Sequence, residues 1–183
     1  MFKVKVSENI IQHCKEQVEN FNFGQRNQAN GTKEQQLTGI IGQSVVMSLF
    51  GLDFVSGESG FDDGTDIEFS GLKIDVKTMG RTTDVRRNYT NNFLKLQDYF
   101  GTEIYIFCSY NKTNFELTVC GWIDKLNFVD KRNYFPKGTT RTRTDGSTFN
   151  TFSDLYEIDI VHLNDSQNFE ELKKQLLHFS KTS

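Results

Sequence analysis

Two aspartates and a lysine stand close together in the segment from Gly64 to Thr78, and their types suit phosphodiester chemistry. Asp66 comes nine residues before Asp75, and Lys77 follows Asp75 by two. Mg²⁺ is typically bound in proteins by one or two carboxylates together with waters and substrate phosphate. A lysine beside such a site can stabilise charge that develops on the phosphate or orient the attacking water. The segment therefore holds the side chains that metal-assisted hydrolysis requires.

The spacing of these residues fits a β-hairpin. Ser70-Gly71 predicts a two-residue turn, because glycine readily takes the positive φ that such turns need. Counting outward from the turn places Asp66 directly opposite Asp75. Side chains alternate across a strand, so the hairpin has a polar and an apolar face. The polar face comprises Asp66, Glu68, Lys73, Asp75 and Lys77, and the apolar face comprises Ile67, Phe69, Leu72, Ile74 and Val76.

An amphipathic hairpin with a solvated polar face is the simpler interpretation, with Glu68 and Lys73 as a favourable cross-strand pair. It does not account for Asp66 and Asp75, since like charges at facing positions, with Cβ atoms about 5 Å apart, destabilise a hairpin. A divalent cation held between two carboxylates removes this repulsion. We therefore expect a Mg²⁺ or Mn²⁺ site at the two aspartates.

The elements that position the hairpin follow from periodicity and turn residues. Helices are predicted at 7–21, capped by Ser7, at 33–50, opened by a capping box of Thr32 and Gln35, at 92–99 and at 168–179. Strands are predicted at 52–55, 65–69, 72–78, 103–109, 116–123 and 155–161, and a long basic loop at 130–151. In the second helix, Gly39 and Gly42 would let the backbone approach a sheet closely.

The pattern Asp66 … Asp75-Val76-Lys77 on a hairpin behind a helix resembles the PD-(D/E)xK nuclease superfamily, and the helix GIIGQSVVMSLFGL looks most like its Holliday-junction-resolvase and restriction-endonuclease branches. The resemblance covers residues 33–124. It implies an α/β (α+β) fold with a restriction-endonuclease-like core, a central mixed sheet flanked by helices in the order helix, three strands, helix, strand. Residues 1–183 would form a single nuclease-like domain, with the helix at 7–21 and a strand and helix at 155–180 as additions.

The resemblance also implies residue roles. Carried over residue by residue, it makes Asp66 and Asp75 metal ligands, the Val76 backbone carbonyl a third ligand and Lys77 the catalytic lysine. Members of the family often have a glutamate on the preceding helix, at about the place of Gln43. An amide oxygen can bind a metal ion or a water, but it holds a cation less firmly than a carboxylate does.

Other acids are alternatives to Gln43 as the fourth residue of the site. Glu34 lies nine residues earlier and half a helical turn out of phase, so Glu34 and Gln43 cannot both point at one site. Gln43 fits the family spacing better, and Glu34 also suits the first turn of a helix, where the helix dipole favours a negative charge. Asp62 and Asp63 could instead donate a ligand, although they also suit a simple acidic loop.

The charges are unevenly distributed along the chain. A net charge of −3 does not indicate a strongly basic nucleic-acid-binding domain. However, an acidic stretch at 53–68 is followed by basic residues at 73–95, which suits a metal site beside a phosphate-binding surface. Arg81, Arg86 and Arg87 follow the lysine-bearing strand and are the best placed to contact DNA. Arg141 and Arg143 belong to a basic segment with aromatic residues, which suits either a phosphate-contacting loop or a solvated one.

Composition excludes several other classes of protein. The three cysteines have no CxxC spacing and the three histidines are scattered, which argues against a disulfide framework or a zinc site. No segment is apolar enough to cross a bilayer, and the charged start does not resemble a signal peptide, so we expect a cytoplasmic protein. With 183 residues and 36% apolar content, one domain is expected.

These observations predict a Mg²⁺- or Mn²⁺-dependent nuclease without an organic cofactor, most simply a DNA endonuclease, and a homodimer if it cuts both strands. The alternative is an inactive protein of the same fold that binds DNA or a protein partner. The absence of a helix glutamate favours the alternative. The complete set of Asp66, Asp75 and Lys77 favours the enzyme.

Overall fold

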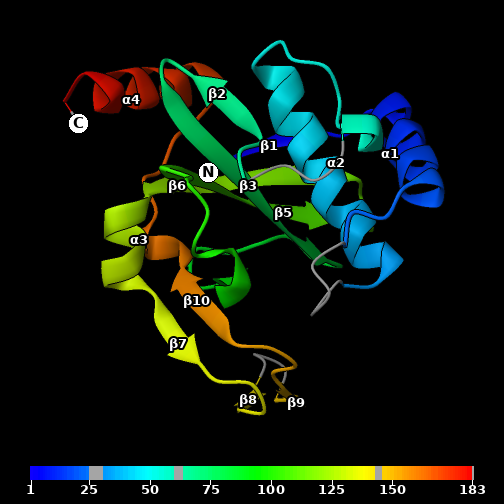
Figure 1. Ribbon diagram of the computed structural model, residues 1–183, viewed down its shortest axis with the longest axis vertical. Helices are drawn as coiled ribbons and strands as arrows, with labels where there is room; N and C mark the ends of the chain where they lie inside the picture. The colour runs from blue at the N-terminus through cyan, green and yellow to red at the C-terminus, as the bar shows by residue number, and fades with distance from the viewer. Residues whose placement is uncertain (25–30, 60–63, 143–145, 183) are drawn as a thin grey trace.

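The computed structural model describes residues 1–24, 31–59, 64–142 and 146–182. In this part of the chain a five-stranded sheet has helices against one face and a small three-stranded sheet against the other (Figure 1). The expected mixed α/β class is confirmed. None of the helices among these residues combines the length and the apolar character needed to cross a membrane.

The central sheet is mixed and has the strand order β1-β6-β5-β3-β2. Its strands are β1 (Phe2–Lys5), β2 (Ile67–Phe69), β3 (Leu72–Arg81), β5 (Ile104–Asn111) and β6 (Glu116–Asp124). Strands β3 and β5 are parallel, and the other pairs are antiparallel. Every residue of β5 is buried, because this strand is covered on both faces of the sheet.

Three helices share the core on one face of the sheet, namely α1 (Glu8–Asn20), α2 (Lys33–Leu49) and α4 (Phe169–Thr182). The predicted caps are confirmed: Ser7 Oγ accepts from the Ile10 N–H at 3.3 Å, and Thr32 and Gln35 form a complete capping box. Helix α2 lies close to β3 at Gly42, where an added Cβ would come within 1.9 Å of Thr78 Oγ1. Gly42 therefore sets the distance between α2 and β3.

The opposite face of the sheet is covered by an aromatic cluster. It is formed with the small sheet of β4 (Thr90–Leu94), β10 (Leu155–Asp159) and β7 (Asn133–Phe135) and with helix α3 (Lys125–Lys131). The rings of Phe93, Tyr105 and Phe128 lie 5.0 Å apart, centroid to centroid. Strands β8 (Thr140–Thr142) and β9 (Thr148–Asn150) form a separate hairpin at the lower edge of Figure 1. Short 3₁₀ turns are η1 (Gly57–Ser59), η2 (Lys95–Gln97) and η3 (Ile160–His162).

Three predicted elements are wrong, and the N-terminal strand β1 was not predicted. The segment 52–55 is not a strand, because its backbone is satisfied by helix side chains: the Val55 N–H donates to Ser44 Oγ at 3.2 Å, and its carbonyl lies 2.8 Å from the His13 ring. The segment 92–99 is mainly β4 and η2 instead of a helix. The expected loop at 130–151 contains β7, β8 and β9 and the end of α3.

Candidate active site

The predicted hairpin is present, with the predicted register near its turn. Ile67 pairs with Ile74, Glu68 with Lys73 and Phe69 with Leu72. Ser70 and Gly71 both have positive φ, 51° and 80°, as a two-residue turn of this kind requires.

Asp66 departs from this register. Its N–H donates to the Ile74 carbonyl at 2.9 Å, and its Oδ2 accepts the Val76 N–H at 2.7 Å. The carboxylate thus takes the place that a backbone carbonyl of β2 would hold in a continued ladder. Strand pairing ends at Ile67, so the expectation that Asp66 lies directly opposite Asp75 in the ladder is wrong.

Among the described residues, no strand pairs with β3 beyond Ile74 on the side of β2, and we call this side the open edge of β3. N–H and carbonyl groups of successive strand residues point alternately to the two edges. The Lys73 carbonyl points towards β5 and accepts the Glu103 N–H at 2.9 Å, whereas the Val76 N–H points to the edge where Asp66 lies. The Val76 carbonyl therefore lies on the same open edge as Asp66.

Asp75 and Lys77 form a buried ion pair. Lys77 Nζ lies 2.6 Å from Asp75 Oδ2, and the two side chains are 16% and 3% exposed. The ammonium also lies 5.6 Å from the centroid of the Phe93 ring. On the polar face of β3, Asp75 and Lys77 are therefore covered by the small sheet, whereas Lys73 is exposed, so only part of this face is solvated. A buried carboxylate needs such compensation, because an unpaired charge in the interior is strongly destabilising.

Tyr105 is the cross-strand neighbour of Asp75 in the parallel pair. Its ring is fully buried, and its hydroxyl has no hydrogen-bond partner among the described residues. Burial first, and then the negative charge of Asp75, raise the pKa of Tyr105 above its usual value. The phenol therefore stays neutral and protonated beside the ion pair.

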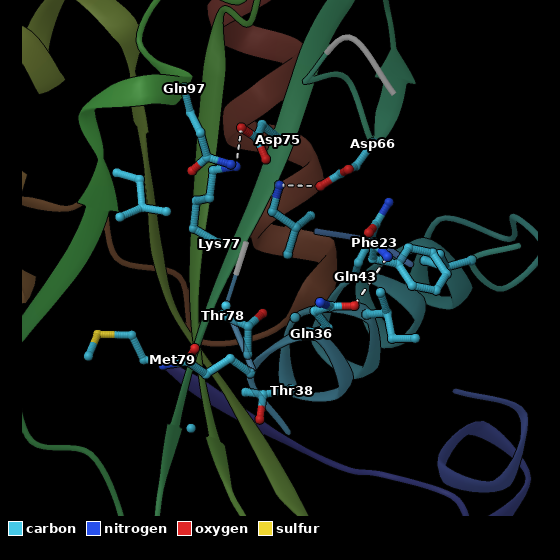
Figure 2. A pocket seen from close by; sticks show the side chains of 18 of the residues that line it. Phe23, Gln36, Thr38, Gln43, Asp66, Asp75, Lys77, Thr78, Met79 and Gln97 are labelled. Carbon is cyan, nitrogen blue, oxygen red and sulfur yellow. Dashed lines mark hydrogen bonds and ion pairs between the residues drawn. The ribbon is translucent and has the colours of Figure 1, made fainter. Parts of the chain in front are cut away.

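Helix α2 contributes Gln43 to the site. Gln43, Asp66, Asp75 and Lys77 line one cleft of about 1280 Å³, and Figure 2 shows Gln43 and Asp66 extending into it from α2 and from the segment before β2. Glu34 also lines this cleft and is exposed. Its carboxylate accepts from Lys112 Nζ at 2.6 Å, and this bond lowers the pKa of Glu34. Both alternatives therefore line the cleft, and of the two it is Glu34 that is held in an ion pair with Lys112.

The cleft reaches both faces of β3 around its open edge. Thr78 faces α2 across Gly42, while Asp75 and Lys77 face the small sheet. The crossover from β3 to β5 adds Asn92, Gln97 and Phe100 to the lining, and Gln97 is only 6% exposed. Sequence reasoning missed these residues. They stand in no motif with Lys77, and it is the parallel β3–β5 connection that brings them there.

Most of the arginines expected to bind DNA are engaged within the protein. Arg81 donates to the Thr90 carbonyl at 2.8 Å and lies over the Tyr89 ring, and burial lowers its pKa. Arg87 is ion-paired with Asp165. Arg141 lies 2.6 Å from Glu157 and stacks on Phe135 at 3.8 Å. None of these three arginines lines the cleft.

Four further residues were expected to bind metal or DNA, and the structure describes only one of them. Arg86 is exposed, outside the cleft lining. Asp62, Asp63 and Arg143 lie outside the described residues.

The donor set at the open edge can be compared with what a divalent cation needs. Among the described residues, no group of three or more His, Cys, Asp and Glu side chains is placed to hold a metal ion. Mg²⁺ does not require one, because it is usually bound by one or two carboxylates plus waters and substrate phosphate. Asp66, Asp75 and the Val76 carbonyl therefore fit a Mg²⁺ or Mn²⁺ ion better than they fit zinc, which favours nitrogen and sulfur ligands.

Comparison with protein-family models, with curated proteins and with solved structures found no match to this chain.

Proposed function

We propose that this protein is a metal-dependent nuclease of the PD-(D/E)xK superfamily that hydrolyses phosphodiester bonds in DNA. The observation that carries the proposal is that Asp66 and the ion-paired Asp75 and Lys77 all line one cleft beside β3. A purely structural hairpin has no need to line a large cleft with two carboxylates and a buried lysine.

The arrangement of elements supports a restriction-endonuclease-like core. Helix α2 packs on β3, the second strand of the hairpin, and a crossover then leads to the parallel strand β5. Two features depart from the expected order. The first of the three strands, at 52–55, is absent, and the crossover holds β4 and the short turn η2 in place of a longer helix.

Each residue has a distinct role in this proposal. Asp66, Asp75 and the Val76 carbonyl would hold Mg²⁺ or Mn²⁺, which when bound would polarise the phosphoryl oxygen and lower the pKa of water. Lys77 would place a positive charge next to the phosphate, where negative charge develops during hydrolysis. Gln43 would hold a water through its amide oxygen or its amide N–H.

A second candidate function is DNA binding without cleavage. Two observations favour it. Position 43 is an amide where the family often has a carboxylate, and the Lys77 ammonium is neutralised by Asp75 at 2.6 Å. If substrate and metal do not separate this pair, the cleft holds a strand without reacting.

Cleavage assays separate the two functions. The protein would be incubated with four DNA substrates, namely plasmid, linear duplex, single-stranded and branched DNA. Each incubation would contain Mg²⁺, Mn²⁺ or EDTA. We expect products from at least one substrate, only with metal, and none from Asp66→Asn. The asparagine can still accept the Val76 N–H, so this variant keeps the local fold but loses a negative charge. No cleavage by wild type under any condition, or equal cleavage by the variant, would contradict the nuclease proposal.

A further inference from the structure

A second hollow opens beside the cleft on the outer side of the crossover. It has a volume of about 740 Å³ and is lined by Lys95, Leu96, Tyr99, Lys137, Phe152, Ser153 and Asp154, and we refer to it as the outer hollow. Phe152 and Ser153 also line the cleft, so the two hollows adjoin each other at these residues. A chain-like ligand that passes over Phe152 and Ser153 would therefore contact both the cleft and the outer hollow.

Two aromatic rings of the outer hollow are exposed to an unusual degree. Tyr99 is 79% exposed and Phe152 is 74% exposed. Tyr99 stands on the ring of Phe100, with centroids 4.5 Å apart, and Phe100 itself lines the cleft. Large aromatic side chains usually bury most of their area, so neighbouring exposed rings indicate a surface that binds something flat or apolar.

The lining of the outer hollow holds two lysines and one carboxylate, so its net charge is positive. Lys95 and Lys137 contribute positive charges, and the Lys95 side chain is 45% exposed. The one carboxylate in the lining, Asp154, is held by the Tyr134 hydroxyl at 2.9 Å, the Lys137 backbone N–H at 3.0 Å and Lys95 Nζ at 3.6 Å. The charge of Asp154 is thus partly compensated inside the protein, and the Lys137 ammonium is not used for it.

We propose that the outer hollow binds single-stranded nucleic acid and guides it into the cleft. Exposed aromatic rings bind unpaired bases by stacking, and lysines beside them bind the phosphate backbone. A duplex keeps its bases stacked inside and offers no face to Tyr99 and Phe152, so the hollow selects unpaired strands, including flaps and ends. The proposal names the substrate class of the proposed nuclease and in that respect rests on it.

The test is equilibrium binding of a fluorescent oligothymidylate of about 15 nucleotides, a length within the range that one single-strand binding module covers. The comparison ligand is a duplex of the same length. EDTA is present throughout, so neither metal binding nor cleavage enters the measurement. Wild type should bind the single strand about tenfold or more tightly than the duplex.

Two double variants probe the rings and the charges separately. Tyr99→Ala with Phe152→Ala should weaken single-strand binding by about tenfold or more without changing duplex binding. Lys95→Ala with Lys137→Ala should lower the slope of log affinity against log salt by about 0.7 for each lysine. The controls are Leu126→Ala, which removes another exposed apolar side chain, and Lys181→Ala, which removes a charge from α4; both should bind like wild type.

Equal affinity for single strand and duplex, or wild-type binding by both double variants, would overturn the proposal. A change of oligomeric state in the ring variant, with single-strand affinity unchanged, would also overturn it and make the hollow a protein interface. Cleavage is measured separately. A protein that binds single strands in EDTA but never cuts DNA with metal fails only the proposed function, and one that cuts DNA without using the hollow fails only this inference.

Discussion

Replacing Lys77 by methionine is expected to slow DNA cleavage by about 100- to 1000-fold, the range found when one preorganised electrostatic group is removed from an active site. Methionine keeps much of the apolar stem of the lysine, so the change removes mainly the ammonium that lies over the Phe93 ring. The same substitution leaves the buried Asp75 carboxylate without its cation at 2.6 Å, so thermal stability should also fall.

A binding measurement distinguishes lost catalysis from lost folding in this variant. The ammonium repels a divalent cation at Asp75, so Lys77→Met should bind Mn²⁺ at least as tightly as wild type while cleaving far more slowly. Lys73→Met is the matched control, because Lys73 lies on the same strand but is exposed and outside the cleft lining. Cleavage by Lys77→Met at the wild-type rate would remove Lys77 from the mechanism, and equal losses in both variants would indicate a general charge effect.

Adding one methyl group at Gly42 is expected to destabilise the protein by about 1 to 3 kcal/mol, the usual cost of overpacking a core. The new Cβ would lie 1.9 Å from Thr78 Oγ1 and 2.8 Å from Thr78 Cβ, so α2 and β3 must separate. Because α2 carries Gln43 and β3 carries Asp75 and Lys77, the shift should also lower cleavage. Chemical denaturation of Gly42→Ala measures the loss in the free energy of unfolding.

Gly39 provides a control of opposite sign on the same helix. Nothing lies within 4 Å of a Cβ added there, so Gly39→Ala gains only helix propensity and should stabilise the protein by up to about 1 kcal/mol. Thr78→Ala removes the Oγ1 atom that the new Cβ would meet, so combined with Gly42→Ala it should recover part of the lost stability, since neighbouring substitutions are not additive. If both alanine variants stabilise the protein equally, α2 does not approach β3 as closely as described.

Local sequence patterns predicted the hairpin and the helix caps because the groups that form them are neighbours in the chain. The turn at Ser70-Gly71 fixed the pairing of three residues on each side. The residue that completes the capping box with Thr32 lies only three positions later in the sequence. The register failed at Asp66, where a side-chain oxygen replaces a backbone acceptor for the Val76 N–H. The alternation of side chains along a strand does not predict that a side-chain oxygen will replace a backbone carbonyl as the acceptor.

The parts of the site that were not predicted depend on partners far apart in the sequence. Arg87 is bound by Asp165 and Arg141 by Glu157, so residues that looked available for DNA neutralise acids elsewhere in the fold. Gln97 reaches the cleft only through the crossover between the parallel strands. The burial of Asp75 likewise follows from a small sheet built from segments far from the hairpin.

The central claim is that Asp66 and Asp75 together hold one divalent cation, and calorimetric titration with Mn²⁺ tests it without any substrate. We expect saturable binding to wild type and a loss of at least about tenfold in affinity for Asp66→Asn and for Asp75→Asn, since even changes outside the direct ligands cost that much. Glu68→Gln, an exposed carboxylate on the same hairpin, should bind like wild type. Wild-type affinity in both aspartate variants would contradict the shared metal site and with it the account of the cleft as an active site.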